Sequence, residues 1–123
     1  MSHTRTPYQW IFDVDYEHFD GQVVIPSHEH PILVDLWADW CSPCLALSPV
    51  LERMVQELGG RVRLAKVEVD EGDNMKLAGH YRVRGFPTVL LFEQGAERAR
   101  FSGARHVYQV REFIEQHSRL LAR

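Results

Sequence analysis

Apolar positions along the chain alternate between the period of a strand and the period of a helix. Runs that are apolar throughout or at every second residue predict strands, and runs with apolar residues three or four apart predict helices. The helical spacing near Phe19 and Val23 is weak, and Pro26 should end any helix there. Strands are predicted at residues 10–15, 30–37, 61–70, 87–95 and 98–103, and helices at residues 16–25, 42–58, 73–81 and 106–121.

This order of elements, β-α-β-α-β-α-β-β-α, indicates an α/β fold. Strands that alternate with helices are parallel and joined by crossovers, whereas the last two strands follow each other directly and should form a hairpin. We therefore expect a central mixed β-sheet flanked by helices on both faces. Residues 10–123 should form a single domain, preceded by a loose N-terminal arm at residues 1–9.

Composition and charge narrow the possible partners. The chain has 123 residues, of which 45% are hydrophobic and 25% charged, as in ordinary soluble domains. Its formal net charge of −3 argues against nucleic acid or an anionic membrane as the main partner. The opening stretch MSHTRTPYQW lacks the apolar core of a secretory signal, so we expect a cytoplasmic protein. A monomer is expected, because no large exposed apolar face is evident.

Cys41 and Cys44 are the only cysteines, and they lie in the stretch WCSPC between an interior strand and a helix. The free N–H groups and the dipole at a helix start favour a thiolate, so Cys41 should be the attacking thiol. Cys44, one turn later, can attack the mixed disulfide that Cys41 forms and release the substrate reduced. Pro43 suits the first helical turn and stiffens the ring that the cysteines close on oxidation.

The cysteines have two other possible roles, in a zinc site or as inert thiols. A structural zinc site needs about four ligands, and this motif supplies two. His28 and His30 could approach from before the strand, but we expect no metal. Inert core thiols are the other alternative, and the polar and ring-bearing neighbours of the cysteines argue instead for a surface turn. In a βαβ setting the motif is typical of redox chemistry.

Two charged residues interrupt apolar strands near the cysteines. Asp35 lies within ILVDLW and should point inward, where loss of solvent raises the pKa of its carboxyl group. Such an acid suits a general base for Cys44, directly or through a water; the alternative is that Asp35 faces solvent on an edge strand. Lys66 interrupts RLAKVEVD and could pair with Asp35 across neighbouring strands, or occupy a solvated position.

Taken together, these segments resemble the thioredoxin family over residues 10–117. The similarity is carried, in family order, by VDLWADWCSPC, LSPVLERM, AKVEVDE, YRVRGFPTVLLFEQG and FSG. The resemblance implies a thioredoxin fold and a protein-disulfide reductase that binds no cofactor. Its partners would be disulfide-containing proteins and a thioredoxin reductase, a flavin enzyme that supplies electrons from NADPH.

The resemblance also implies a role for each site residue. Cys41 would be the nucleophile, Cys44 the resolving thiol, and Asp35 the buried acid that Lys66 tunes. Pro87 would follow a cis peptide bond, and Trp37 would pack beneath the site. The apolar platform for an extended substrate would consist of Trp40, Gly85, Phe86, Pro87 and Gly103.

Two positions depart from the family pattern. Ser42 replaces the usual Gly and should tune the reduction potential, either by donating to the Cys41 sulfur or by capping the helix. Leu45 replaces the usual Lys or Arg, which makes the rim more apolar and puts the usual reductase docking and substrate range in doubt. The departures leave two alternatives to a reductase: a thioredoxin-like binding module or holdase chaperone, and an oxidant or isomerase of an export pathway.

Overall fold

The computed structural model describes residues 7–121, which form one five-stranded mixed sheet in the order β1-β3-β2-β4-β5. The first three strands in this order run parallel, and β4 and β5 are antiparallel to their neighbours. The mixed sheet with a closing hairpin is the one that the sequence predicts. Its strands are β1 (Ile11–Asp13), β2 (Ile32–Trp37), β3 (Arg63–Glu68), β4 (Thr88–Glu93) and β5 (Ala96–Ser102).

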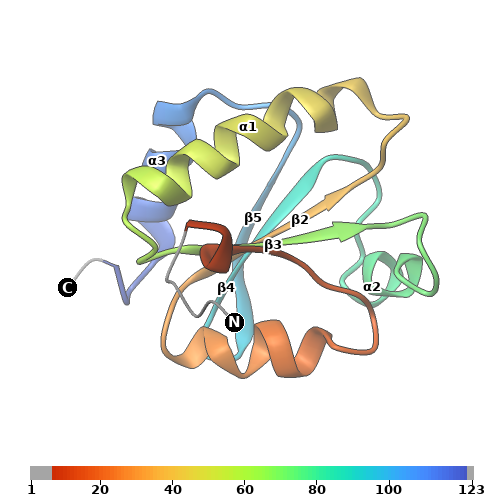
Figure 1. Ribbon diagram of the computed structural model, residues 1–123, viewed down its shortest axis with the longest axis horizontal. Helices are drawn as coiled ribbons and strands as arrows, with labels where there is room; N and C mark the ends of the chain where they lie inside the picture. Colours follow the sequence, from red (N-terminus) through yellow and green to blue (C-terminus); the bar gives the residue numbers. More distant parts are fainter. Residues whose placement is uncertain (1–6, 122–123) are drawn as a thin grey trace, which may run out of the picture.

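Helices cover both faces of the sheet (Figure 1). α1 and α3 lie on one face, where Leu33 of β2 packs in their apolar cluster, and α2 lies on the other with η2, where Leu36 packs. This division follows from the strand period of two, which sends successive side chains to opposite faces. The helices are η1 (Pro7–Trp10), η2 (Asp20–Val24), η3 (Pro26–His28), α1 (Ser42–Glu57), α2 (Met75–His80) and α3 (Val107–His117).

The helix predicted at residues 16–25 is not an α-helix. Its place is taken by the π-helical turn η2 and the 3₁₀ turn η3. Pro26 directly follows the C-cap residue of η2, and the segment ends there as predicted, because proline has no N–H to continue the hydrogen-bond ladder. The apolar positions Phe19 and Val23 are nevertheless buried, so the spacing predicted which residues face the core.

The expected domain limits lie partly outside the described residues. Of the arm predicted at residues 1–9, only its last three residues are described, and they belong to η1. The division into an arm and a domain over 10–123 stays a prediction. No helix between residues 7 and 121 has the length and apolar character needed to cross a membrane.

Candidate active site

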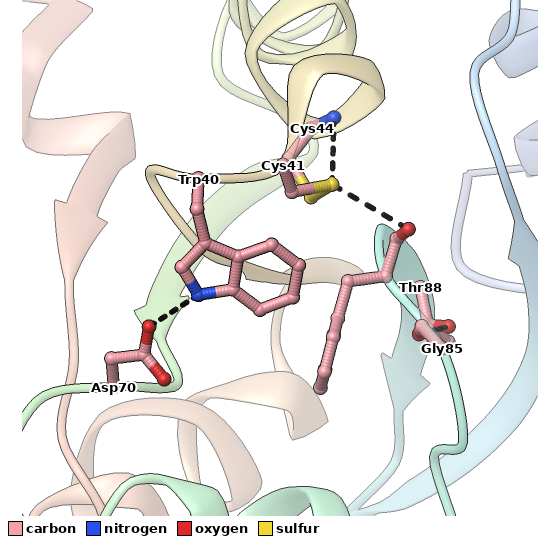
Figure 2. Close-up of a disulfide and its surroundings, with 7 residues drawn as sticks. Trp40, Cys41, Cys44, Asp70, Gly85 and Thr88 are labelled. Carbon is pink, nitrogen blue, oxygen red and sulfur yellow. Dashed lines mark hydrogen bonds between the residues drawn. A yellow bond between two sulfur atoms is a disulfide. The ribbon is translucent and has the colours of Figure 1, made fainter.

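The two cysteines form a disulfide at the carboxyl end of β2 (Figure 2). Cys41 is the N-cap residue of α1, with an extended backbone (φ −101°, ψ 102°), and Cys44 lies in the first turn. The Cα atoms are 5.2 Å apart, and the backbone N–H of Cys44 donates to Cys41 Sγ at 3.3 Å. The helix start thus directs a hydrogen-bond donor at the sulfur that the sequence assigns as nucleophile.

The two sulfur-bearing residues differ in depth, as expected. Cys41 is 6% exposed and Cys44 is 1% exposed, so the first cysteine is the more accessible. Ser42 is the first residue of the helix and not its cap, and its exposed side chain forms no hydrogen bond with the Cys41 sulfur. The cap role of its hydroxyl is therefore wrong, because Cys41 itself occupies the cap position. Donation to the sulfur of reduced Cys41 stays a prediction. Pro43 lies in the first turn, as predicted.

The residues expected to form the substrate platform surround Cys41. Cys41 Sγ lies 3.6 Å from the carbonyl oxygen of Phe86, and the Phe86–Pro87 peptide bond is cis. The rings of Trp40 and Phe86 meet edge to face with centroids 6.4 Å apart, and Trp40 is 64% exposed. An exposed indole and a half-buried phenyl ring therefore flank the disulfide.

Hydrogen bonds hold the two glycines of this platform in place. The N–H of Gly103 donates to the carbonyl of Pro87 at 2.9 Å, and φ at Gly103 is +83°, which favours glycine. The hydroxyl of Thr88 donates to the carbonyl of Gly85 at 2.6 Å. The structure thus brings Gly85 and Gly103 into one surface with Phe86, and the sequence reasoning missed Thr88, whose polar side chain opens an otherwise apolar strand.

Asp70 is another site residue that the sequence reasoning missed. Its carboxylate accepts a hydrogen bond from Trp40 Nε1 at 2.6 Å (Figure 2). Asp70 follows β3, and the parallel strands β2 and β3 end at the same edge of the sheet. That shared edge could have indicated from the sequence that Asp70 lies near Trp40. The bond fixes the indole beside Cys41.

Asp35 is buried in the middle of the sheet, as predicted. It lies on β2 between β3 and β4, is 1% exposed, and neither carboxylate oxygen has a hydrogen-bond partner among residues 7–121. Burial raises the pKa of Asp35 to about 7, while the Lys66 charge opposes the rise and the Glu52 charge adds to it. The alternative of a solvent-facing residue on an edge strand is wrong. The carboxyl group can gain or lose a proton near neutral pH.

Lys66 is the register partner of Asp35 on β3, but the expected ion pair between them is not formed. The ammonium bonds instead to the hydroxyl of Ser48 at 2.8 Å and the carboxylate of Glu52 at 3.2 Å, both on α1. It also lies 5.5 Å from the ring centroid of Trp37. Lys66 is therefore neither bonded to Asp35 nor fully solvated, although its charge still lowers the pKa of Asp35 as the resemblance implies. Ser48 and Glu52 gave no local signal, because their role depends on how α1 packs on the sheet.

The histidines considered for a zinc site do not reach the cysteines. His28 and His30 precede β2, whereas Cys41 follows its other end. His30 lies beside Arg63, whose Nη2 is 3.4 Å from His30 Nε2. Between residues 7 and 121, no three histidine, cysteine, aspartate or glutamate side chains are grouped to hold a metal ion.

Comparison with known proteins decides the family. Residues 11–116 match the family model described as Thioredoxin. The chain is 38% identical to the thioredoxin of Haemophilus influenzae over 107 residues, which cover 87% of this chain and 94% of that protein. The chain belongs to the thioredoxin family. It is also 41% identical to the thioredoxin of Acidithiobacillus ferridurans over 105 residues, covering 85% and 94% of the two chains.

Family membership and geometry together establish the chemistry of this thioredoxin. The Cys41–Cys44 pair is a redox-active disulfide at a helix start, and the protein is a thiol–disulfide oxidoreductase. Similarity to "Thioredoxin C-2" of Corynebacterium nephridii, at 38% identity over 86% of this chain, agrees with this assignment. Dithiol–disulfide exchange proceeds through the two sulfurs and needs no bound cofactor.

Proposed function

We propose that this thioredoxin reduces disulfides of other proteins, with Cys41 as nucleophile and Cys44 as resolving thiol. The Cys41 thiolate attacks one substrate sulfur, forms a mixed disulfide and expels the other substrate sulfur as a thiolate. Cys44 then loses its proton and attacks Cys41 Sγ, which re-forms the Cys41–Cys44 disulfide and releases the second substrate thiolate. The substrate takes up two protons and two electrons in all.

The position of Cys41 carries this proposal. Its sulfur accepts the N–H of Cys44 and is the less buried of the pair. Charge-assisted hydrogen bonds to a thiolate, together with the helix dipole, stabilise the attacking form. The platform of Trp40, Phe86 and Pro87 lies where an extended substrate segment would reach this sulfur.

Asp35 is proposed as the group that accepts the proton of Cys44, directly or through a water molecule. A proton acceptor works best when its pKa is near the working pH, and burial brings the pKa of Asp35 to about 7. The same group returns the proton when the disulfide is reduced again. We propose that a flavin-dependent reductase using NADPH supplies those electrons, and that the protein works as a monomer in the cytoplasm.

Replacing each cysteine by serine separates the two sulfur roles. Cys41→Ser should abolish reduction of a model protein disulfide, because no thiolate can begin the attack. Cys44→Ser should accumulate a mixed disulfide with the substrate, detectable by mass under non-reducing conditions. Turnover by Cys41→Ser would refute the assignment of the nucleophile.

The reduction potential separates a reductant from an oxidant. Thioredoxins have potentials near about −270 mV, and strongly oxidising relatives lie near about −120 mV. Equilibration of the Cys41–Cys44 pair against a thiol redox buffer should give a value near the lower figure. A value near the higher figure would favour an oxidant or isomerase of an export pathway, despite the family's usual role.

Exposed apolar side chains at the rim favour one additional activity. Trp40 is 64% and Leu45 is 51% exposed, beside the disulfide. This rim suits the binding of unfolded segments, as in a holdase. A double Cys41→Ser, Cys44→Ser variant should then still slow aggregation of a denatured client, whereas complete loss of protection would exclude binding without redox chemistry.

A further inference from the structure

Three side chains form a closed polar triangle between α1 and β3. Lys66 Nζ donates to Ser48 Oγ at 2.8 Å and to Glu52 Oε2 at 3.2 Å, and Ser48 Oγ donates to Glu52 Oε2 at 3.2 Å. The spacing of four residues places Ser48 and Glu52 on one face of α1. The hydroxyl of Ser48 accepts from Lys66 and donates to Glu52, whose carboxylate accepts both bonds. Two groups of α1 therefore hold the ammonium of Lys66.

The triangle adjoins the buried carboxyl group of Asp35. Asp35 and Lys66 are register partners on β2 and β3, so both side chains project from the same face of the sheet toward α1. Neighbouring strands lie about 4.8 Å apart, a distance that a lysine side chain can readily bridge. Asp35 nevertheless has no hydrogen-bond partner in the part of the chain that the structure describes. The contacts from α1 therefore compete for the ammonium that Asp35 would otherwise hold.

We propose that Ser48 and Glu52 are positioning residues that hold Lys66 away from Asp35 and so keep Asp35 free to accept a proton. This inference rests on the proposed role of Asp35 in deprotonating Cys44. In this arrangement the ammonium acts on Asp35 only across space. If the triangle opened, Lys66 could bond directly to Asp35, stabilise its carboxylate and make it a weaker base.

The charged groups around Asp35 and Lys66 are few. Lys66 and Glu52 are the charges that act on Asp35, and β4 presents the apolar Val89 at the same register position. On β1, Asp13 is the register partner of Lys66 but forms no ion pair with it. Glu52 therefore affects Asp35 in two ways: by its own negative charge and by retaining the ammonium. Both favour the protonated form of Asp35.

The central experiment measures the pKa of Asp35 in the oxidised protein by NMR of its carboxyl carbon. Glu52→Gln should lower that pKa by about one unit, a tenfold change in proton affinity, because both effects of Glu52 are lost. Glu57→Gln is the matched control. It removes the same charge from the same helix, but Glu57 pairs with Arg53 and Arg111 and should leave the pKa of Asp35 unchanged.

Ser48→Ala separates position from charge. This variant removes one contact of the ammonium without changing any charge, so a fall in the pKa of Asp35 would come from movement of Lys66 alone. We expect a fall of roughly half a unit, and Ser48→Thr, which keeps the hydroxyl, should restore the original value. Helix content and thermal melting of each variant check that the fold is intact; Ser48→Ala is the mildest change.

Repeating Glu52→Gln in a Lys66→Met variant tests whether Glu52 acts on Asp35 through Lys66. If Glu52 acts through Lys66, Glu52→Gln should lower the pKa of Asp35 less in Lys66→Met than in the natural chain, which a double-mutant cycle measures. Equal shifts in both backgrounds, with no effect of Ser48→Ala, would overturn the positioning role and leave only the charge of Glu52.

Activity distinguishes this inference from the proposed function. The rate of mixed-disulfide resolution should follow the pKa of Asp35 across these variants. If NMR shows the expected shifts but the pH profile of resolution does not move, Ser48 and Glu52 position Lys66 as inferred and Asp35 is not the proton acceptor. If the pH profile follows Asp35 but Ser48→Ala and the cycle show no coupling, the proposed role of Asp35 holds and the positioning role fails.

Discussion

Two carboxyl groups are buried in the same sheet, and their surroundings are opposite. Glu93, at the end of β4, is 1% exposed and lies among hydrogen-bond donors from the end of α3 and beside a guanidinium from β5. One oxygen accepts the hydroxyl of Ser118 and the N–H of Leu120, at 3.1 Å for the latter. The other accepts the N–H of Arg119 at 2.8 Å and lies 3.2 Å from Nε of Arg98.

Asp35 has equal burial and no such partners. Both of its oxygens lack a hydrogen bond from the described residues, and the cation that acts on it, Lys66, is bonded to α1. A buried charge is stable only when donors replace the lost water. Glu93 meets this condition and joins the end of α3 to the sheet. Asp35 does not, so burial favours its neutral form and leaves it able to titrate.

Burial alone therefore does not determine the role of a carboxyl group. The number of donors around it decides whether its oxygens are held by other elements or stay free to exchange a proton. In this thioredoxin the satisfied group, Glu93, lies at the end of the sheet away from the disulfide, and the unsatisfied group, Asp35, lies on the strand that leads to Cys41.

The largest expected effect is a gain in stability from Asp35→Asn at high pH. Burial raises the pKa of Asp35 from 3.8 to about 7, so between these values the folded state holds a proton that the unfolded state has lost. The free energy of unfolding of the natural chain therefore falls as pH rises through this window. Asp35→Asn escapes the loss and should be more stable by about 4 kcal/mol above pH 7.

Urea unfolding of the oxidised protein between about pH 5 and about pH 8.5 measures this difference. The advantage of Asp35→Asn should grow up to about pH 7 and then level off. An advantage of the same size at every pH would mean that the ionisation of Asp35 is not the cause. Glu57→Gln, which removes an exposed carboxylate, should show no such growth.

Glu93→Gln should change the free energy of unfolding in the opposite direction and destabilise the protein. An amide keeps one acceptor oxygen and turns the other into a donor, and either orientation directs that donor at groups that already donate or carry a positive charge. We expect a loss of about 3 kcal/mol in the free energy of unfolding, measured by urea unfolding at neutral pH. Glu97→Gln on β5 breaks an ion pair with Arg100 nearer the surface, and should cost under about 1 kcal/mol.

The sequence predicted the burial of only one of these two carboxyl groups. Asp35 interrupts an apolar run of a central strand, which is a local pattern, and it lies next to the cysteine motif. Glu93 precedes Gln94 and Gly95, so it looks like an ordinary polar residue at the start of a turn. Its hydrogen-bond donors are 25 to 27 residues away, and no local period connects them to Glu93.

The difference between local patterns and contacts across elements also explains which other features of the fold and the site were predicted. α1 was predicted within one residue at its end, because its apolar residues recur at helical spacing over four turns. The contacts of Lys66 were not predicted, since they depend on how α1 packs on β3. Periodicity thus predicts elements and buried faces, but which polar groups meet across elements depends on tertiary packing.

Activity should separate the two carboxyl groups as clearly as stability does. At pH 7, Asp35→Asn should slow resolution of the mixed disulfide by at least about tenfold, because Cys44 loses its proton acceptor. Glu93→Gln should change the same rate by less than about twofold wherever it is folded, because Glu93 does not touch the sulfurs. Stopped-flow mixing of reduced protein with a disulfide substrate measures both. Equal slowing in the two variants would show that general loosening of the fold, rather than proton transfer, limits the rate.

The smallest expected effect tests whether a cation or neutral donors hold Glu93. Arg98→Met removes the guanidinium 3.2 Å from Glu93 but keeps much of the side-chain stem, and leaves the donors from Ser118, Arg119 and Leu120 in place. We expect a loss of about 1 kcal/mol in the free energy of unfolding, clearly less than for Glu93→Gln. A loss as large as that of Glu93→Gln would mean that the ion pair outweighs the three other donors. Glu93 would then depend on its cation, and the contrast with Asp35 would lie in the distance to a cation, not in the number of hydrogen-bond donors.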